Sequence, residues 1–361
     1  MQRDRLSFPV LVLALVVASW WPLASEAADR ATSVPHIVVL ATGGTIAGAA
    51  QSGVQASYQS AQLGVDRLLA AVPEAGRLAA IRGEQIANIG SQDMNDAVWL
   101  ELARRVDEVL ADPGVAGVVI THGTDTIEET AFFLDLVVRS DKPVVLTAAM
   151  RPSTALSADG PLNFYNAVAV AANERAAGRG VLVVVNDEIH GADSLTKTST
   201  TAVQTFQSPG RGLVGTVAYG ECQFYRGAVR RRAAEARFPL DGVAEIPRVD
   251  VIMAHEGMDG TLIDAAAAAG AKGIVIAGVG NGNMTAAALS AIAAQVRKGI
   301  VCVRASRVGN GLVGRNVEVD DTALGLVAAL DLNPQKARVL LRLALTRTTD
   351  AAAIQRYFEQ Y

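Results

Sequence analysis

Short apolar runs alternate with segments of helical spacing along the first half of the chain. Four runs are apolar at nearly every position: 37–41, 115–120, 143–149 and 181–185. Three intervening segments repeat apolar residues every three or four positions: 62–71, 98–110 and 163–175. The first pattern is typical of strands buried on both faces, and the second predicts helices. Their alternation predicts a mostly parallel sheet covered by helices on both sides.

The same alternation resumes near the C-terminus. Strands are predicted at 249–254, 273–277 and 299–303, and helices at 262–269, 333–345, 351–360 and in a segment that ends at 294. We therefore predict a two-domain α/β protein, in agreement with 361 residues at roughly 150 residues per domain. The expected parts are a larger N-terminal domain at 28–225, a charged linker at 226–248, and a smaller parallel α/β domain at 249–361.

The first 27 residues have the pattern of a secretory signal peptide. Arg3 and Arg5 make a basic start, and the stretch 8–21 is almost wholly apolar. Small residues, Ser25 and Ala27, occupy the two positions that a signal peptidase reads. Because the apolar stretch is short for a membrane span of ~20 residues, we favour a signal peptide over an anchor. We expect cleavage after Ala27 and a periplasmic protein.

Charge and cysteine content exclude several classes. The formal net charge of −4 gives no reason to expect nucleic acid or an anionic membrane as a partner. An exported protein can join Cys222 to Cys302 in a disulfide, but Cys302 lies in an apolar run and fits a buried thiol as well. Two cysteines without a nearby ligand cluster argue against zinc, and we expect neither a metal nor another cofactor.

The turn at 121–126 is the most unusual in the chain. It reads Thr-His-Gly-Thr-Asp-Thr, follows the apolar run 115–120, and precedes a helical pattern with Glu128 and Glu129 in its first turn. In α/β sheets, ligands bind where strands end and helices begin. An ordinary turn needs a glycine and an acid, but not this set of hydroxyls, carboxylate and imidazole. We interpret the turn as half of an active site.

A glycine-rich strand-end loop at 42–48 supplies the other half. Its sequence, TGGTIAG, matches neither the dinucleotide nor the phosphate-loop spacing, so we expect its glycines to present Thr45 in an open pocket. The stretch 49–61 is small and polar with Tyr58 as its only aromatic residue, which is typical of a lid over a site. Ser91 and Gln92 lie in a polar turn before the next helix, where ordinary turn chemistry is an equal interpretation.

Threonine hydroxyls need a neighbour that takes their proton before they act as nucleophiles. A lysine with a pKa lowered by burial, oriented by a carboxylate, meets this need, and Thr124, Asp125 and Lys197 could form that set. The alternative for Lys197 is an ordinary solvated lysine. His122 more simply packs within its turn. The residues alone predict a hydroxyl-centred hydrolase, or a binder of a small polar ligand, that uses no metal.

The polar residues in the second half of the chain fit structural roles in turns and on the surface. Asn281 and Asn283 lie in a glycine-rich turn after a predicted strand and fit ordinary turn formers. The acidic stretch 317–321 fits a solvated run of charges.

Taken together, these motifs resemble the bacterial L-asparaginase and glutaminase-asparaginase family. TGGTIAG at 42–48 resembles its first signature, and GVVITHGTDTIEET at 117–130 resembles its second. The likeness continues through NIGSQDMND, KPVV, AMRPS, SADGP, the TKT around Lys197, GVGNGN, and LNPQKARVLL at 332–341. It covers essentially the whole mature chain. With the signal peptide, the chain is similar to the periplasmic, type II branch.

The resemblance implies hydrolysis of the side-chain amide of L-asparagine to L-aspartate and ammonia, with some activity on L-glutamine. The implied route uses a threonine nucleophile and an acyl-enzyme intermediate. Thr45 would be the nucleophile with Tyr58 helping to activate it, and Thr124, Asp125 and Lys197 would form a second, triad-like set. The sequence leaves open which threonine attacks.

The resemblance also implies how the substrate is held. Ser91 and Asp125 would bind its α-carboxylate and α-amine, Gln92 would help with the amine, and the backbone carbonyl of Ala149 would lie near the side-chain amide. Two further residues match polar residues that a neighbouring subunit contributes in a homotetramer of intimate dimers: Asn283 and Glu318.

Three departures limit the resemblance. The segment MAHEGMDG at 253–260 and the lid at 49–60 match poorly, and the cysteines do not match the family's pair, so no disulfide is carried over. The preference for asparagine or glutamine stays open because the lid closes on the substrate side chain. A non-catalytic periplasmic binder of acidic amino acids is the main alternative, and a dinucleotide-binding enzyme is a distant third.

Overall fold

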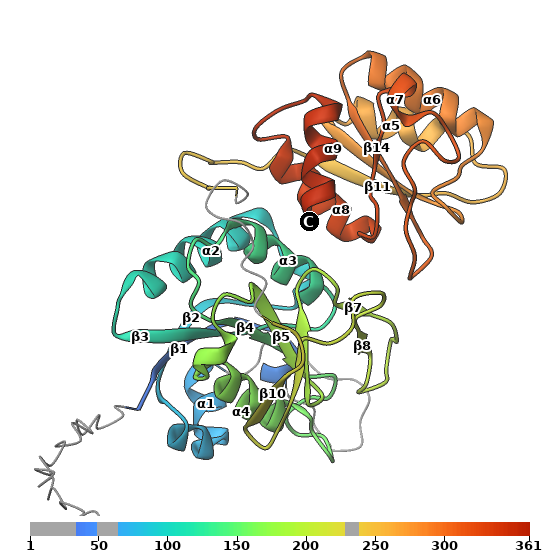
Figure 1. The fold of residues 1–361 in the computed structure, drawn as a ribbon. Helices are drawn as coiled ribbons and strands as arrows, with labels where there is room; N and C mark the ends of the chain where they lie inside the picture. Colours follow the sequence, from blue (N-terminus) through green and yellow to red (C-terminus); the bar gives the residue numbers. More distant parts are fainter. Residues whose placement is uncertain (1–33, 49–63, 228–237) are drawn as a thin grey trace, which may run out of the picture. The chain divides into compact units, whose positions relative to one another are not determined.

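The computed structural model describes residues 34–48, 64–227 and 238–361 (Figure 1). The predicted signal peptide, the stretch that contains Tyr58, and residues 228–237 of the predicted linker lie outside the described residues. The described chain contains an eight-stranded sheet, a four-stranded sheet and a two-stranded ribbon. It is a two-domain α/β protein, as the alternating pattern predicts.

The eight-stranded sheet has the order β10-β9-β6-β5-β4-β3-β1-β2. Its strands are β1 (His36–Gly43), β2 (Ala80–Ile89), β3 (Val115–Thr121), β4 (Val144–Thr147), β5 (Val181–Val185), β6 (Glu188–Gly191), β9 (Gly215–Ala218) and β10 (Glu221–Phe224). Strands β1 to β5 run parallel, whereas β6, β9 and β10 pair antiparallel. The sheet is therefore mixed. Positive φ values at Asn186 and Asp187 let the chain reverse within two residues between β5 and β6.

Helices cover both faces of this sheet (Figure 1). They are α1 (Val65–Ala71), α2 (Asp96–Ala111), α3 (Ile127–Val137) and α4 (Gly160–Ala171). Val38 and Val118 belong to the core that includes α2 and α3. Their neighbours Val39 and Val119 belong to a separate core that includes α1 and α4. Because successive residues of one strand enter opposite cores, these strands are apolar at every position.

The smaller sheet is wholly parallel, in the order β11-β12-β13-β14. Its strands are β11 (Val249–Met253), β12 (Gly273–Gly278), β13 (Val301–Ser306) and β14 (Val327–Ala328). Its helices are α5 (Thr261–Ala268), α6 (Ala286–Arg297), α7 (Asp321–Leu324), α8 (Pro334–Ala344) and α9 (Ala351–Gln360). Helices α5 and α6 share one core with this sheet, and α8 and α9 share the other.

The acidic stretch at 317–321 differs from its prediction. Asp321 is fully buried, and its carboxylate accepts hydrogen bonds from Arg304 Nε and Nη2 at 2.6 and 2.8 Å. Asp320 caps α7 by accepting the Ala323 N–H at 2.9 Å. The prediction of a solvated charge run is wrong at Asp321, because this acid pairs with a buried arginine of β13, whereas Asp320 is exposed and also satisfies a helix terminus.

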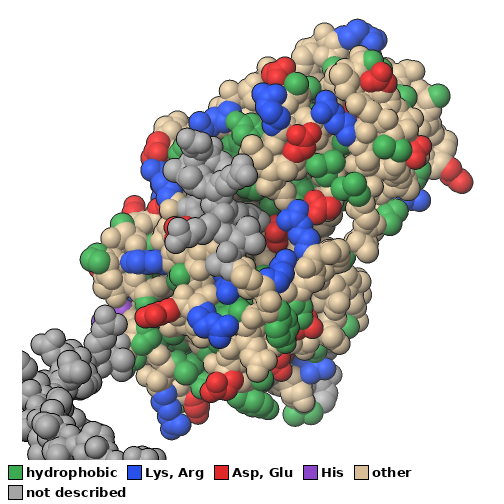
Figure 2. Space-filling view, viewed as in Figure 1, with side chains coloured by type: hydrophobic (Ala, Val, Ile, Leu, Met, Phe, Trp, Pro, Cys, Tyr) green, Lys and Arg blue, Asp and Glu red, His purple; other side chains and the backbone are tan. Residues whose placement is uncertain are grey.

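Both cysteines are free thiols. Cys302 is buried on β13, and this burial raises the pKa of its thiol to about 12. Cys222 lies on β10 of the other sheet. Among the described residues, no helix has the length and apolar character needed to cross a membrane. On the face shown in Figure 2, basic and acidic side chains are interspersed rather than gathered by sign.

We predict that Asp321→Asn destabilises the protein by about 3–5 kcal/mol, because it leaves the Arg304 guanidinium buried without a counter-charge. Urea denaturation of the purified protein measures this free energy of unfolding. Asp250→Asn is the matched control, since its ion pair with Arg248 is half exposed and should contribute less than about 1 kcal/mol. Equal effects of the two substitutions would contradict the assignment of the buried pair.

Candidate functional site

Three loops meet near one edge of the large sheet, after β1, β2 and β3. Strand β1 lies between β2 and β3, so the sequence order reverses across it and opens a crevice at the carboxyl ends of these strands. The loops that follow the three strands carry Thr45, Ser91 and Thr124. They enclose a pocket of about 280 Å³ lined by Gly44, Thr45, Gly90, Ser91, Gln92, Gly123, Thr124 and Asp125. In each of the three loops, a glycine of the lining directly precedes a predicted site residue: Gly44 before Thr45, Gly90 before Ser91, and Gly123 before Thr124.

Two glycines allow the loops to approach this closely. Gly44 has φ = +83°, and a Cβ atom there would lie 2.4 Å from the backbone nitrogen of Gly123. A Cβ atom on Gly123 would in turn lie 2.5 Å from Ser91 Oγ. Any side chain at either position would push the loops apart, so the glycines serve close approach of backbone to backbone and present Thr45 at the pocket wall.

Hydrogen bonds between the loops fix their relative positions. The Gly44 N–H donates to the Ile89 carbonyl at 3.0 Å, which ties the loop after β1 to the end of β2. Thr42 Oγ1 donates to the Thr121 carbonyl at 2.9 Å, which ties it to the end of β3. These bonds make the pocket wall part of the sheet edge rather than a free loop.

Lys197 brings the predicted triad together. It lies on β7 (Thr196–Lys197), which pairs with β8 (Phe206–Gln207) in the two-stranded ribbon. Its Nζ donates to Thr124 Oγ1 at 2.9 Å and to Asp125 Oδ1 at 2.6 Å. The Lys197 side chain is only 16% exposed, so the solvated alternative is wrong. An ammonium that donates to a hydroxyl oxygen stabilises negative charge there and helps that hydroxyl give up its proton.

Ser91 and Asp125 form the part of the pocket suited to an amino acid backbone. The Asp125 N–H donates to Ser91 Oγ at 3.2 Å, and Thr126 Oγ1 donates to the Ser91 carbonyl at 2.7 Å. The Ser91 hydroxyl still carries a proton that it can donate to an anion. The Asp125 side chain is 60% exposed and Gln92 is exposed, so both are accessible to a ligand.

Of the described residues, four predicted site residues do not line this pocket. Lys197 reaches it through Thr124 and Asp125, and the other three are Ala149, Asn283 and Glu318. Ala149 is buried and belongs to the same core as Ile46, the neighbour of Thr45. Asn283 pairs with the backbone of Val279 in the second domain. Glu318 is exposed there and accepts a long hydrogen bond, 3.5 Å, from Asn281 Nδ2. Tyr58 lies outside the described residues. The single chain thus assembles the sites for Thr45, Ser91, Gln92, Thr124, Asp125 and Lys197 and leaves Asn283 and Glu318 elsewhere.

His122 packs within its turn, as expected. Its Nδ1 lies 2.8 Å from the Gly123 carbonyl oxygen, and its Nε2 lies 2.9 Å from Thr130 Oγ1. Trp99 Nε1 donates to the same Thr130 oxygen at 2.9 Å. Because the Gly123 carbonyl only accepts, Nδ1 carries the proton of the neutral ring and donates to it. The unprotonated Nε2 then accepts from the Thr130 hydroxyl, whose oxygen accepts from Trp99. Burial lowers the pKa of this neutral imidazole to about 4.

Asp159 holds a loop in place, a role that the sequence analysis did not predict. Its carboxylate accepts the backbone N–H groups of Met150 and Arg151, both at 2.9 Å, and so holds the loop after β4. The only indication in the sequence was that Asp159 belongs to the segment SADGP, which resembles the family. Among the residues that the structure describes, no group of three or more His, Cys, Asp or Glu side chains is arranged to hold a metal ion.

We predict that His122 makes the protein less stable in acid. The unfolded imidazole has a pKa of about 6.5 and the folded one about 4, so between these values only the unfolded chain binds the proton. The free energy of unfolding should therefore fall as the pH drops from about 6.5 to about 4, by up to about 3 kcal/mol. Urea denaturation across this range measures the slope.

His122→Gln should be less stable at neutral pH yet show a flatter slope, because the titrating group is gone. His36→Gln, at an exposed position where β1 begins, is the control and should keep the wild-type slope. A wild-type slope in His122→Gln would contradict the assignment.

Comparisons with known proteins agree with this geometry. The family described as "Asparaginase, N-terminal" matches residues 36–230, and "Glutaminase/Asparaginase C-terminal domain" matches residues 248–358. The chain is 51% identical over 332 residues to "Probable L-asparaginase periplasmic" of Haemophilus influenzae, covering 92% of this chain and 95% of that protein. It is 47% identical to "L-asparaginase 2" of Escherichia coli, covering 92% and 94% of the two chains.

Two further similar proteins are a relative named for glutaminase as well as asparaginase activity and a protein of solved structure. The chain is 42% identical to "Glutaminase-asparaginase" of Pseudomonas fluorescens biotype A, covering 96% of this chain and 97% of that protein. The crystal structure of "Probable Cytoplasmic L-asparaginase" from Campylobacter jejuni superposes with a TM-score of 0.87 at 45% identity, covering 91% of this chain and all of that one. The chain therefore belongs to the asparaginase family of amidohydrolases, which includes L-asparaginases and glutaminase-asparaginases.

Proposed function

We propose that this protein hydrolyses the side-chain amide of L-asparagine to L-aspartate and ammonia, with some activity on L-glutamine. The observation that carries the proposal is the pocket at the ends of β1, β2 and β3. There Thr45 lies in the same wall as Thr124 and Asp125, which hold the Lys197 ammonium at 2.9 and 2.6 Å. A binding protein for amino acids needs a carboxylate and hydrogen-bond donors, but it does not need a second hydroxyl paired with an ammonium.

Substrate recognition follows from the charges of a zwitterion. Its ammonium needs an anion, which the exposed carboxylate of Asp125 supplies, with Gln92 beside it. Its carboxylate needs donors, which the Ser91 hydroxyl and loop N–H groups supply. The backbone carbonyl of Ala149 would accept from the substrate's side-chain amide.

We assign Thr45 as the nucleophile. Thr124 Oγ1 already accepts a hydrogen bond from the Lys197 ammonium, which draws electron density from that oxygen and suits it to relaying a proton rather than attacking. Thr45 Oγ1 would attack the amide carbon, with Tyr58 from the stretch 49–61 helping to take its proton. Backbone N–H groups of the pocket loops would stabilise the tetrahedral oxyanion, an effect that can be worth ~3 kcal/mol per donor.

Collapse of the tetrahedral intermediate would break the carbon–nitrogen bond. The leaving nitrogen takes up a proton and departs as ammonia, and an aspartyl ester remains on Thr45. Water would then attack this ester, release aspartate and restore the hydroxyl. The set of Thr124, Asp125 and Lys197 would relay protons in both steps, since it joins a hydroxyl, a carboxylate and an ammonium within hydrogen-bond distance.

Completion of the site by a second subunit is part of the proposal. Asn283 and Glu318 lie outside the pocket of their own chain, so in a homotetramer of intimate dimers they would reach the pocket of a neighbouring chain, with Glu318 near the substrate ammonium. Export to the periplasm is supported by the signal-peptide pattern at 1–27 and by the relative named periplasmic in Haemophilus influenzae. The domain boundaries at 28–225 and 249–361 stay a prediction.

We predict that the mature protein releases ammonia from L-asparagine faster than from L-glutamine at equal, low concentration. The carbonyl of the longer amide lies one methylene further from the α-carbon, and one methylene is worth about 1–3 kcal/mol of discrimination. A coupled ammonia assay measures both rates. Tight binding of aspartate without ammonia release from either amide would favour the binding-protein alternative.

Thr45→Ala should lower kcat by at least about a thousandfold, because it removes the attacking oxygen. Thr45→Ser keeps a hydroxyl at the same position and should retain measurable turnover. Circular dichroism melts would show whether both variants keep the wild-type fold. Normal turnover in a folded Thr45→Ala variant would remove Thr45 from the nucleophile role.

A further inference from the structure

The segment LNPQKARVLL at 332–341 has no part in the proposed chemistry, yet its first residues contact the chain next to both halves of the triad. Helix α8 begins at Pro334 within this segment. Asn333, Gln335 and Lys336 reach from there to the first turn of α3 and to the chain just before Lys197. These two segments are the ones that must meet if Lys197 is to contact Thr124 and Asp125.

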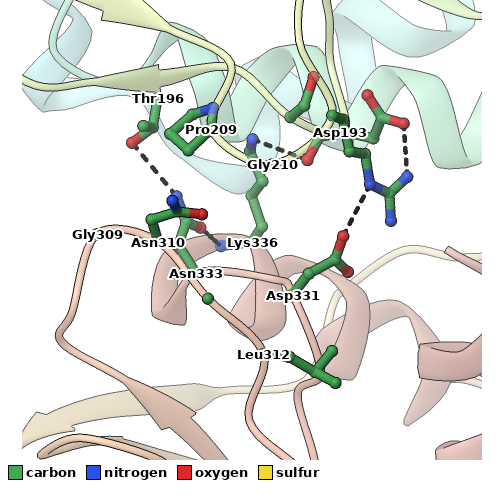
Figure 3. Close-up of a pocket in the computed structure, with 13 residues that line it drawn as sticks. Asp193, Thr196, Pro209, Gly210, Gly309, Asn310, Leu312, Asp331, Asn333 and Lys336 are labelled. Carbon is green, nitrogen blue, oxygen red and sulfur yellow. Dashed lines mark hydrogen bonds and ion pairs between the residues drawn. The ribbon is translucent and has the colours of Figure 1, made fainter.

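Lys336 is an ammonium buried in the interior, with only 2% of the residue exposed. Its Nζ donates to the backbone carbonyl of Asp193 at 3.1 Å (Figure 3). It also donates to the backbone carbonyl of Leu195. These carbonyls lie four and two residues before Lys197. A buried ammonium is costly unless its protons find acceptors, so the two carbonyls are tightly constrained partners. Burial lowers the pKa of Lys336 to about 8.

Arg211 attaches the same segment through a side chain. It donates from Nη1 to Asp193 and from Nε to Asp331, both at 2.8 Å (Figure 3). Asp331 lies just before α8, so the guanidinium bridges the start of the 193–197 segment and the start of that helix. The 193–197 segment is thus held in two ways: Lys336 binds its backbone carbonyls, and Arg211 binds the side chain of Asp193.

Helix α3, which follows Thr124 and Asp125, is attached to the same helix terminus. Glu128, in the first turn of α3, accepts hydrogen bonds from Asn333 Nδ2 at 3.1 Å and Gln335 Nε2 at 2.9 Å. Glu128 lies three residues after Asp125. Asn333 Nδ2 also lies 3.5 Å from Thr196 Oγ1, and its Oδ1 accepts the Lys336 N–H at 3.0 Å as the cap of α8.

We infer that Lys336 and Asn333 are positioning residues for Lys197: the start of α8 fixes the separation between the loop that carries Thr124 and Asp125 and the segment that carries Lys197. The inference rests on the proposed function and adds a role for the C-terminal domain within its own chain. A cavity of about 280 Å³ adjoins these residues, lined in part by Thr196, Asn333 and Lys336 (Figure 3). Hydrogen bonds rather than close packing therefore hold the segment on that side.

The test uses Lys336→Met in the full-length protein, because methionine keeps a linear side chain and removes the three donors. We expect kcat for asparagine to fall by about 10- to 100-fold, the effect of misplacing a catalytic group by about 1 Å. The rising limb of kcat/KM against pH should also move to higher pH, because Thr124 gives up its proton less readily without the ammonium in place. If the variant only reduced the amount of folded protein, kcat/KM would fall by the same factor at every pH and the rising limb would stay at the same pH.

Lys142→Met is the matched control. Lys142 Nζ also donates to two backbone carbonyls, those of Leu110 and Asp112 at 3.0 and 2.6 Å, but it lies before β4, away from the pocket. This variant should keep kcat within about twofold and leave the pH profile unchanged. Asn333→Ser serves if Lys336→Met does not fold. Serine keeps the cap oxygen of α8 but lacks the amide donor to Glu128, so we expect a smaller loss, about 3- to 10-fold, with the same limb shift.

Hydrogen exchange gives a readout that does not depend on turnover. Backbone amides of residues 193–197 should exchange faster in Lys336→Met than in wild type or Lys142→Met. Wild-type exchange there, or a drop in kcat with the limb unmoved in both Lys336→Met and Asn333→Ser, would overturn the inference. A wild-type protein that releases no ammonia would contradict the proposed function instead, and the exchange rates would still decide whether α8 holds the segment.

Discussion

The contact of one ammonium with a hydroxyl and a carboxylate is the interaction on which the site depends. Lys197 lies more than seventy residues after Thr124 and Asp125, yet its Nζ is 2.9 and 2.6 Å from their oxygens. Such a contact needs both partners in fixed positions, because a flexible lysine side chain loses much rotamer freedom when it is held. The structure provides this fixation from three directions: the sheet edge, the glycine contacts and the start of α8.

The sheet order explains why the remaining pocket residues are where they are. Strand β1 lies between β2 and β3, and the chain passes first to β2 on one side and then to β3 on the other. The three following loops must therefore converge at one edge, whatever their exact sequences. What the sequence adds is the pair Gly44 and Gly123, whose backbones approach more closely than any side chain would allow. The fold makes the crevice, and the glycines turn it into a pocket lined by hydroxyls.

Much of this was predictable, for physical reasons that differ between elements. Strands such as β5 (Val181–Val185) are apolar on both faces because they separate two cores, and that pattern is visible in the sequence. The pocket loops were visible because their polar residues exceed what a turn requires. The antiparallel strands β6, β9 and β10 were not, because each is four residues long and β6 follows a two-residue turn.

Other features left no pattern to detect. Arg304 pairs with Asp321 inside the smaller domain, but neither residue differs in sequence context from an exposed charge. Lys336 acts on backbone carbonyls, which every residue possesses, so no partner could be identified beforehand. The role of Lys197 was predicted from its hydroxyl-rich surroundings and the family resemblance, and the structure supplies the contacts that make the role physically reasonable.

The central claim is that Thr45 carries the acyl group during turnover. The most direct test is to mix the mature protein with L-asparagine, quench it rapidly in acid and locate any aspartyl ester by peptide mass mapping. The account predicts an ester on the peptide that contains Thr45. An ester on the peptide that contains Thr124 would contradict it and would make Thr124 the nucleophile.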